Sequence, residues 1–206
     1  MECHVYTTRD FRDTHWGAGT TSEMFIFPEG ASYAERRFDL RLSSATICTE
    51  SSEFTSLPGV ERWICPLDGY LEIEHPEQKV SYRLAPYDLH HFDGGEKTLS
   101  HGCVRDFNIM SKLGRPLRPV RLRRSECRLM ERCNRLLIFS YEGSRVATGS
   151  RQDGACKAEP ADFSFTLTLP PFSLLDLRIA DQDSLHLKNI HGGTIIALPL
   201  FLNTET

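Results

Sequence analysis

Alternation of apolar and polar residues, with a period of two, constrains this chain most strongly. It is clear at residues 38–45, 80–84 and 163–169, which are also rich in strand-forming residues. Turn sequences such as Pro58-Gly59 and Asp93-Gly94-Gly95 separate these segments. Many short strands with frequent turns predict an all-β sandwich or barrel.

The chain also contains an internal repeat. The segment 84–89 (Leu-Ala-Pro-Tyr-Asp-Leu) returns at 169–174 (Leu-Pro-Pro-Phe-Ser-Leu) with an offset of 85, and His101-Gly102 returns as His191-Gly192 with an offset of 90. Upstream, 62–69 resembles 135–143 with an offset of 73 or 74, and an insertion at about 144–162 accounts for the change. The repeat predicts duplicated barrels, at residues 1–113 and 114–206.

The two copies differ in polarity. At an offset of 90, Asp106 and Asn108 correspond to Ile196 and Leu198. The second copy therefore resembles a filled apolar core, and we expect any functional site to lie in the first.

Composition and charge exclude several classes of protein. The 206 residues carry a net charge of -4, which argues against a nucleic-acid partner. No apolar stretch is long enough to span a membrane and no signal peptide is visible, so we expect a cytoplasmic protein without a membrane partner. The seven cysteines are scattered and odd in number, which predicts reduced thiols rather than a disulfide scaffold or a zinc site.

One basic cluster lies between the copies, at Arg115, Arg118, Arg121, Arg123 and Arg124. It lacks the interleaved aromatics or recognition helix of a nucleic-acid site. We interpret it as a linker that runs into an edge strand, whose charges discourage strand pairing.

Several short motifs between residues 15 and 112 resemble those of one known family. They are Trp-Gly-Ala-Gly-Thr-Thr-Ser-Glu at 16–23, Arg-Leu-Ser-Ser-Ala at 41–45, Pro-Gly-Val-Glu-Arg at 58–62, Phe-Asp-Gly-Gly at 92–95 and Asp-Phe-Asn-Ile-Met at 106–110. Together they resemble the HutD/Ves family. The resemblance implies two cupin (RmlC-like jelly-roll) barrels in one chain, a bicupin, and a bacterial cytosolic protein linked to histidine utilisation or to stress responses. It brings no established enzyme activity.

Cupin enzymes generally hold a metal with His-x-His, an acid and a later histidine. Here the acidic position, seven residues before Gly69, is occupied by Arg62, and no imidazole stands at the His-x-His position. We therefore expect no metal and no cofactor. His90 and His91 are adjacent on a strand, so they point to opposite faces, and one of them lies outside the barrel.

Strand alternation groups the polar residues of the first copy on one side. This side carries Arg41 with Ser43, and Asp106 with Asn108, while Leu40, Leu42, Phe107 and Ile109 lie on the other. An arginine offers a planar fork for carboxylates, and amide or hydroxyl groups complete the recognition. We predict a ligand-binding site for a small carboxylate, built from Thr21, Glu23, Arg41, Ser43, Arg62, His91, Asp106 and Asn108.

These observations favour a non-catalytic sensor or regulatory protein with no catalytic residues, and the resemblance suggests urocanate or N-formylglutamate as its ligand. Three alternatives stay open: a metal-independent cupin isomerase or lyase that acts on a small carboxylic acid, a protein-interaction module with a closed lumen, and a purely structural polar network. A homodimer is compatible with each.

Overall fold

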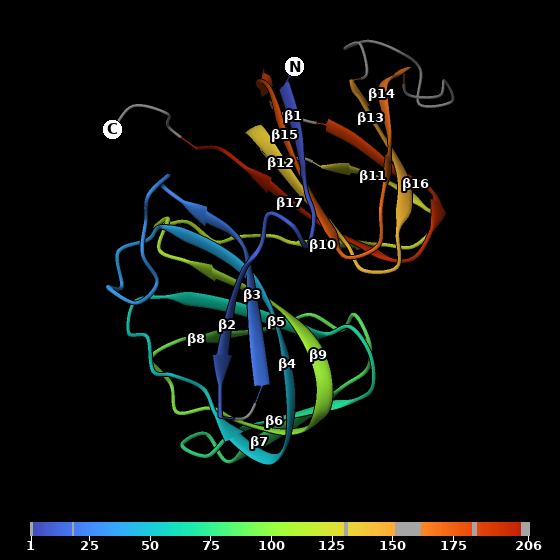
Figure 1. Cartoon of the computed structure of the whole chain (residues 1–206). Coiled ribbons are helices and arrows are strands. Elements are labelled where there is room, and N and C mark those ends of the chain that lie inside the picture. The colour runs from blue at the N-terminus through green and yellow to red at the C-terminus, as the bar shows by residue number, and fades with distance from the viewer. Residues whose placement is uncertain (1, 18, 130–131, 151–161, 183–184, 203–206) are drawn as a thin grey trace. The chain divides into compact units, whose positions relative to one another are not determined.

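A computed structural model describes residues 2–17, 19–129, 132–150, 162–182 and 185–202. Every regular element in this part is a β-strand, as the alternation predicted (Figure 1). No helix of this part is long and apolar enough to cross a membrane. The chain divides into two compact units, which we call the N-terminal unit (residues 10–116) and the C-terminal unit (residues 1–9 and 117–206).

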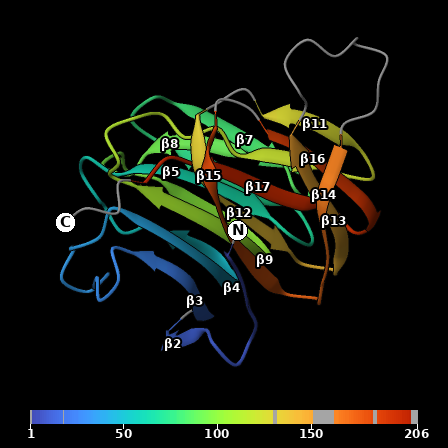
Figure 2. The same ribbon diagram turned by 90° about the horizontal axis from the view of Figure 1, so that it is seen from above.

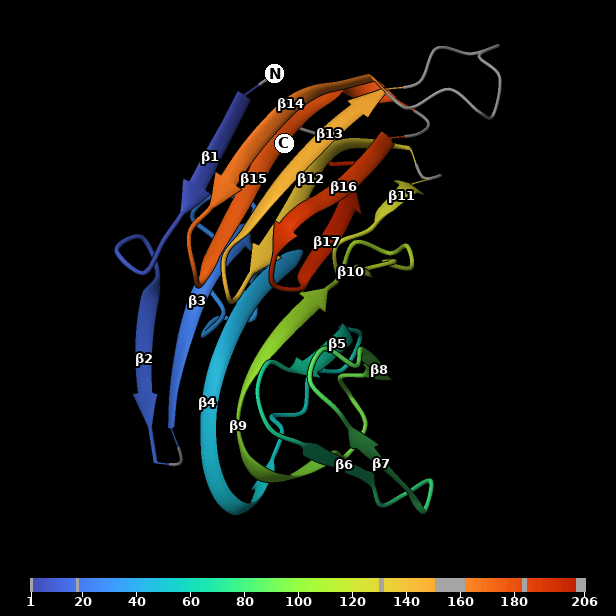
Figure 3. The ribbon, with the colours of Figure 1, turned by 90° about the vertical axis from the view of Figure 1, so that its right-hand side faces the viewer.

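The N-terminal unit is an antiparallel sheet that bends along its length. Its strands follow the order β2-β3-β4-β9-β5-β8, and β6 pairs with both β7 and β9. The long strands β4 and β9 curve strongly, so that β9 joins β5 at one end and β6 at the other (Figure 3). The strands are β2 (Arg12–Trp16), β3 (Gly19–Phe27), β4 (Leu40–Glu53), β5 (Glu61–Pro66), β6 (Leu71–His75), β7 (Val80–Leu84), β8 (His90–Asp93) and β9 (Leu99–Ser111).

One face of this sheet lines the interior of the N-terminal unit. Ile64, Phe92 and Val104 from β5, β8 and β9 pack there against Leu71 and Ile73 of β6. We call this side the inner face. The opposite face of β4 and β9 carries Leu40, Leu42, Phe107 and Ile109, as predicted, and these four side chains are at most 2% exposed.

The C-terminal unit has two sheets. The first has the order β1-β15-β12-β17-β10 and the second β11-β16-β13-β14. The four strands of the second sheet are labelled in Figure 2. The strands are β1 (Glu2–Tyr6), β10 (Val120–Leu122), β11 (Glu126–Leu129), β12 (Cys133–Ser140), β13 (Ser144–Ser150), β14 (Asp162–Leu169), β15 (Ser173–Gln182), β16 (Leu185–Gly192) and β17 (Ile195–Leu200). Between the sheets lies an apolar core that includes Leu136, Ile138 and Leu187.

The connection between the copies follows the prediction. β10, which contains Arg121 of the basic cluster, lies at the edge of the five-stranded sheet and pairs only with β17 among the described strands. Of the predicted insertion at 144–162, residues 144–150 form β13, and 151–161 lie outside the described residues.

The prediction that all cysteines are reduced is wrong for one pair. Cys48 on β4 and Cys103 on β9 form a disulfide, and their Cα atoms are 4.1 Å apart. The two residues lie directly opposite each other in the ladder, on the face opposite the inner face, and both are exposed. Because 55 residues separate the two cysteines, their pairing cannot be predicted from the sequence alone. Cys65 and Cys133 are buried, as predicted for small apolar side chains, and Cys156 lies outside the described residues.

Reduction of this disulfide is expected to lower the free energy of unfolding of the N-terminal unit by about 2–4 kcal/mol, because the crosslink restricts the unfolded chain. Both tryptophans, Trp16 and Trp63, belong to this unit. Urea unfolding followed by tryptophan fluorescence, with and without dithiothreitol, measures the change. The C48S/C103S variant is the control, since it should unfold alike in both conditions. Equal unfolding of the wild-type protein with and without reductant would contradict the prediction.

Candidate functional site

The two units share a strand plan, and comparing their registers shows which residues occupy equivalent inner positions. Arg62 on β5 is opposite Met110 and Phe92, and Leu136 on β12 is opposite Pro199 and Leu177. By the same registers Asp106 and Asn108 are equivalent to Ile195 and Ala197. The sequence alignment, with its offset of 90, was therefore one residue out at this strand, and the correct partners face the apolar core.

The comparison shows which kinds of residue occupy the same inner positions in the two units. The C-terminal unit fills its interior with Leu136, Ile195, Ala197 and Leu175. The N-terminal unit places Arg62, Asp106, Asn108 and His90 at those inner positions. Since the same strand plan carries apolar residues at these positions in one unit, the plan itself does not dictate the polar residues of the other.

Arg62, Asn108 and Asp106 form a buried hydrogen-bonded chain. The Arg62 Nη2 donates to Asn108 Oδ1 at 3.0 Å, and Asn108 Nδ2 donates to Asp106 Oδ1 at 3.3 Å. Asp106 Oδ1 also accepts the backbone N–H of Ala45 at 3.0 Å. The Arg62 guanidinium lies over the rings of Phe54 and Phe92, 4.6 and 5.1 Å from their centroids. The amide of Asn108 is thus fixed in orientation, because it accepts from one neighbour and donates to the other.

Two polar atoms of the hydrogen-bonded group of Arg62, Asn108 and Asp106 have no hydrogen-bond partner among the described residues. They are Arg62 Nε and Asp106 Oδ2, and both are buried. Burial lowers the pKa of Arg62 to about 10, and Arg41 adds to this effect. Burial raises the pKa of Asp106 to about 6, against the opposing effects of the Ala45 N–H, Asn108 and Arg62. An unsatisfied donor and acceptor in a buried place are costly, and they suit a ligand or water that completes them.

A second buried group adjoins this chain. Arg41 Nε donates to Glu23 Oε2 at 2.7 Å and Arg41 Nη1 donates to Ser43 Oγ at 3.1 Å. The ring of Tyr33 lies 4.0 Å from the guanidinium carbon. Ser43 is opposite both Glu23 and Asn108 in the ladder, so the ion pair and the Arg62 chain share the inner face.

The segments that carried the sequence resemblance meet around Arg62. Gly94 donates its N–H to Val60 O at 2.7 Å and accepts from Leu57 N at 2.6 Å. A Cβ at Gly94 would lie 2.8 Å from Val60 O and 3.1 Å from Arg62 Cδ. The Phe-Asp-Gly-Gly and Pro-Gly-Val-Glu-Arg motifs are therefore two halves of one packing arrangement, which positions the Arg62 side chain.

The structure brings six of the eight predicted site residues into this cluster: Glu23, Arg41, Ser43, Arg62, Asp106 and Asn108. Thr21 has the same parity but lies further along β3, where its hydroxyl accepts from Trp16 Nε1 at 3.1 Å.

His91 is a correction to the predicted site. It is opposite Trp63 on the other face of the sheet, with its Nε2 3.0 Å from Glu61 Oε1 and its ring 4.6 Å from the Trp63 ring. The imidazole on the inner face is that of His90, since β8 alternates and its register with β5 puts His90 opposite Ile64.

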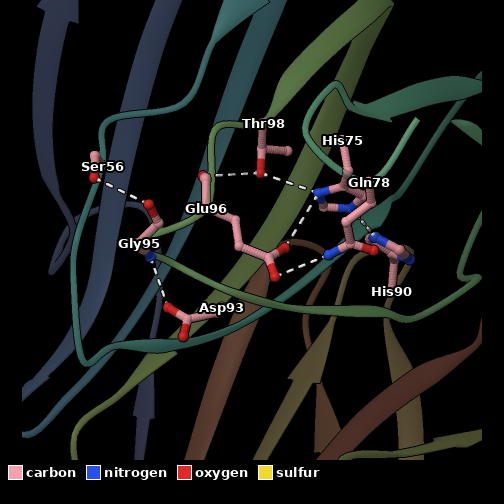
Figure 4. Close-up of polar contacts among 8 residues, drawn as sticks. All are labelled: Ser56, His75, Gln78, His90, Asp93, Gly95, Glu96 and Thr98. Carbon is pink, nitrogen blue, oxygen red and sulfur yellow. Dashed lines mark hydrogen bonds and ion pairs between the residues drawn. The ribbon is translucent and has the colours of Figure 1, made fainter. Parts of the chain in front are cut away.

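Sequence reasoning missed a second polar group, formed by His75, His90 and Glu96 (Figure 4). The Nε2 atoms of the two histidines are 2.9 Å apart, and His75 Nδ1 lies 3.5 Å from Glu96 Oε2. Gln78 Nε2 donates to Glu96 Oε1 at 2.9 Å, and Thr98 Oγ1 lies 3.3 Å from His75 Nδ1. The alternation of Leu71, Ile73 and His75 on β6 was the available signal, because it assigns all three to one face.

Burial and the neighbouring imidazoles disfavour the charged form of His90. Desolvation, with smaller contributions from His75 and His91, lowers the pKa of His90 to about 4. Two nitrogens in hydrogen-bond contact also require one donor and one acceptor. Within the described residues, no group of three or more His, Cys, Asp or Glu side chains has the arrangement of a metal site.

Comparison with known proteins now places the chain. The model of the HutD family matches residues 8–171. This chain belongs to the HutD family. No sequence among curated proteins matches it.

Solved structures show the same fold. HutD from Pseudomonas fluorescens SBW25 is 20% identical with a TM-score of 0.67, over 96% of this chain and 98% of that one. A conserved protein of unknown function from Pseudomonas aeruginosa PAO1 is 21% identical with a TM-score of 0.73, over 98% and 100%. The bacterial pirin YhhW from Escherichia coli, in complex with nickel(II), is 8% identical with a TM-score of 0.62, over 98% and 100%. The predicted all-β bicupin fold of this HutD-family chain is confirmed.

Proposed function

We propose that this protein is a non-catalytic sensor that binds a small carboxylate on the inner face of its N-terminal unit. The observation that carries the proposal is the buried guanidinium of Arg62, whose Nε has no partner among the described residues. Asn108 and two aromatic rings hold this guanidinium in place. A preorganised arginine with an available N–H is suited to a carboxylate, which accepts two parallel hydrogen bonds.

The contrast between the units supports the choice of this site. The position of Arg62 is held by Leu136 in the C-terminal unit, and that of Asn108 by Ala197. The strand plan accepts leucine at this position. A buried arginine there therefore points to recognition of a ligand rather than to a role in folding. Family membership supports the choice of ligand class, since HutD is named for histidine utilisation, whose intermediates urocanate and N-formylglutamate are small carboxylates.

Calorimetric titration of the full chain with urocanate and with N-formylglutamate tests the proposal. We expect saturable binding of at least one of them with one site per chain, and a rise in the thermal unfolding midpoint at ligand excess. Glutamine, which carries an α-ammonium group next to its carboxylate, is a matched control for nonspecific binding. Chemical analysis of the ligand after incubation separates a sensor from an enzyme, since a sensor returns it unchanged. If neither acid binds, the proposal is wrong.

A further inference from the structure

The charged side chains of the inner cluster balance one another. Glu23 pairs with Arg41, and Asp106 is linked to Arg62 through the amide of Asn108. These two cations and two carboxylates are buried or nearly so. Each carboxylate group of a ligand that enters this cluster would add one negative charge to a neutral group that is shielded from water. An uncompensated buried charge is unfavourable by several kcal/mol, so its binding favours the uptake of a compensating proton.

Asp106 has the geometry to accept that proton. Its side chain is fully buried, and its Oδ1 already accepts from Ala45 N and Asn108 Nδ2. Its Oδ2 has no partner among the described residues, so a proton can be added there without breaking a bond. A protonated Oδ2 would be a donor, and a ligand carboxylate oxygen is an acceptor. The acid and the Arg62 guanidinium would then stand at the two ends of one hydrogen-bonded chain.

We propose that Asp106 takes up one proton when the inner cluster binds a carboxylate, so that ligand and proton bind together. This inference rests on the proposed function. It is supported by the effect of burial on Asp106, which raises its pKa to about 6 before any ligand is present. An anion bound nearby raises the pKa of Asp106 further, because it disfavours a second negative charge.

The other ionisable groups on the inner face do not offer the same proton acceptor. The guanidinium groups of Arg41 on β4 and Arg62 on β5 are donors only and offer no acceptor for a proton. Arg105 on β9 lies on the opposite face, with Phe107 and Ile109. Glu23 on β3 is held by its bond to Arg41. Tyr33, whose ring lies 4.0 Å from the guanidinium carbon of Arg41, offers a phenol and not a carboxylate. His75 on β6 and His90 on β8 face the same interior, and the H90Q variant tests this hydrogen-bonded pair.

Calorimetry at pH 8 in phosphate and in Tris, two buffers with different ionisation enthalpies, measures proton uptake directly. The probes are N-formylglutamate and urocanate, neither of which titrates at this pH. We expect an uptake close to one proton per ligand, and affinity that falls about tenfold per pH unit above pH 7. With N-formylglutamate at pH 5, where Asp106 is already protonated, the uptake should be close to zero.

Three variants locate the proton. D106N mimics the protonated acid, so it should bind without proton uptake and with affinity that does not fall above pH 7. H90Q and the exposed D13N should take up a proton as the wild-type protein does. Binding without uptake by the wild-type protein overturns the inference and leaves the proposed function intact, as does uptake that persists in D106N. Binding of neither probe at any pH overturns both.

Discussion

Replacing Arg62 by leucine is expected to reduce the affinity for N-formylglutamate or urocanate about 100-fold or more. The side chain supplies the charge and the available N–H for the ligand. A bidentate, charge-assisted contact contributes about 3 kcal/mol, and 1.4 kcal/mol is a factor of ten. Leucine stands at the equivalent position of the C-terminal unit, as Leu136, so its size and shape suit the strand plan. The thermal unfolding midpoint of R62L, measured beside its affinity, separates loss of binding from loss of fold.

Calorimetric titration of R62L measures the loss, with two variants for comparison. R62K keeps the charge but not the planar fork, so it should bind with intermediate affinity. R83L removes an arginine that lies over the ring of Tyr70 on the exposed side of β7, and it should bind like the wild-type protein. Wild-type affinity in R62L would exclude this arginine from the site and leave the structural-network interpretation.

Replacing Glu23 by alanine is expected to act on stability, lowering the free energy of unfolding by about 3–5 kcal/mol. The side chains of Arg41 and Glu23 are only 7% and 13% exposed. Removing the carboxylate leaves a buried cation without its counter-ion, which is the costly way to break such a pair. The pair of Arg37 and Glu35 is the matched control, since those side chains are 76% and 56% exposed.

Urea unfolding followed by tryptophan fluorescence compares E23A with E35A. Both tryptophans belong to the N-terminal unit, so the signal reports on the unit that carries both substitutions. E35A should change the free energy of unfolding by less than about 1 kcal/mol. If E23A is no more destabilising than E35A, the ion pair contributes little to the fold.

Strand alternation predicted more of the site than any motif did. It placed Arg41 with Ser43, and Asp106 with Asn108, on one face, because neighbouring residues of a strand alternate whatever their partners. The relation between strands was harder to predict. Whether His90 or His91 shares a face with Arg62 depends on the register between β5 and β8, which the distant turns and packing determine.

Contacts between residues far apart in the chain could not be predicted from the sequence either, because they also depend on the register between strands. The pairing of Cys48 with Cys103 needs the register of β4 and β9, and the contact of His75 with His90 needs the bend that brings β6 to β8. The alignment of the two copies was wrong by one residue because it matched the identical pairs His101-Gly102 and His191-Gly192, which are 90 residues apart. The registers of β9 and β17 instead place equivalent inner residues 89 apart.

The pairing of β1 with β15 has a consequence for the order in which the protein forms. Glu2–Tyr6 is synthesised long before its partner residues, Leu174–Arg178. The N-terminal unit is continuous in sequence, so all of its strands are available before the second half exists. During synthesis β1 therefore has no partner until β15 has been made, and only then does it pair with the edge of β15. Long-range pairing of this kind slows folding, and it makes completion of the C-terminal unit depend on both ends of the chain.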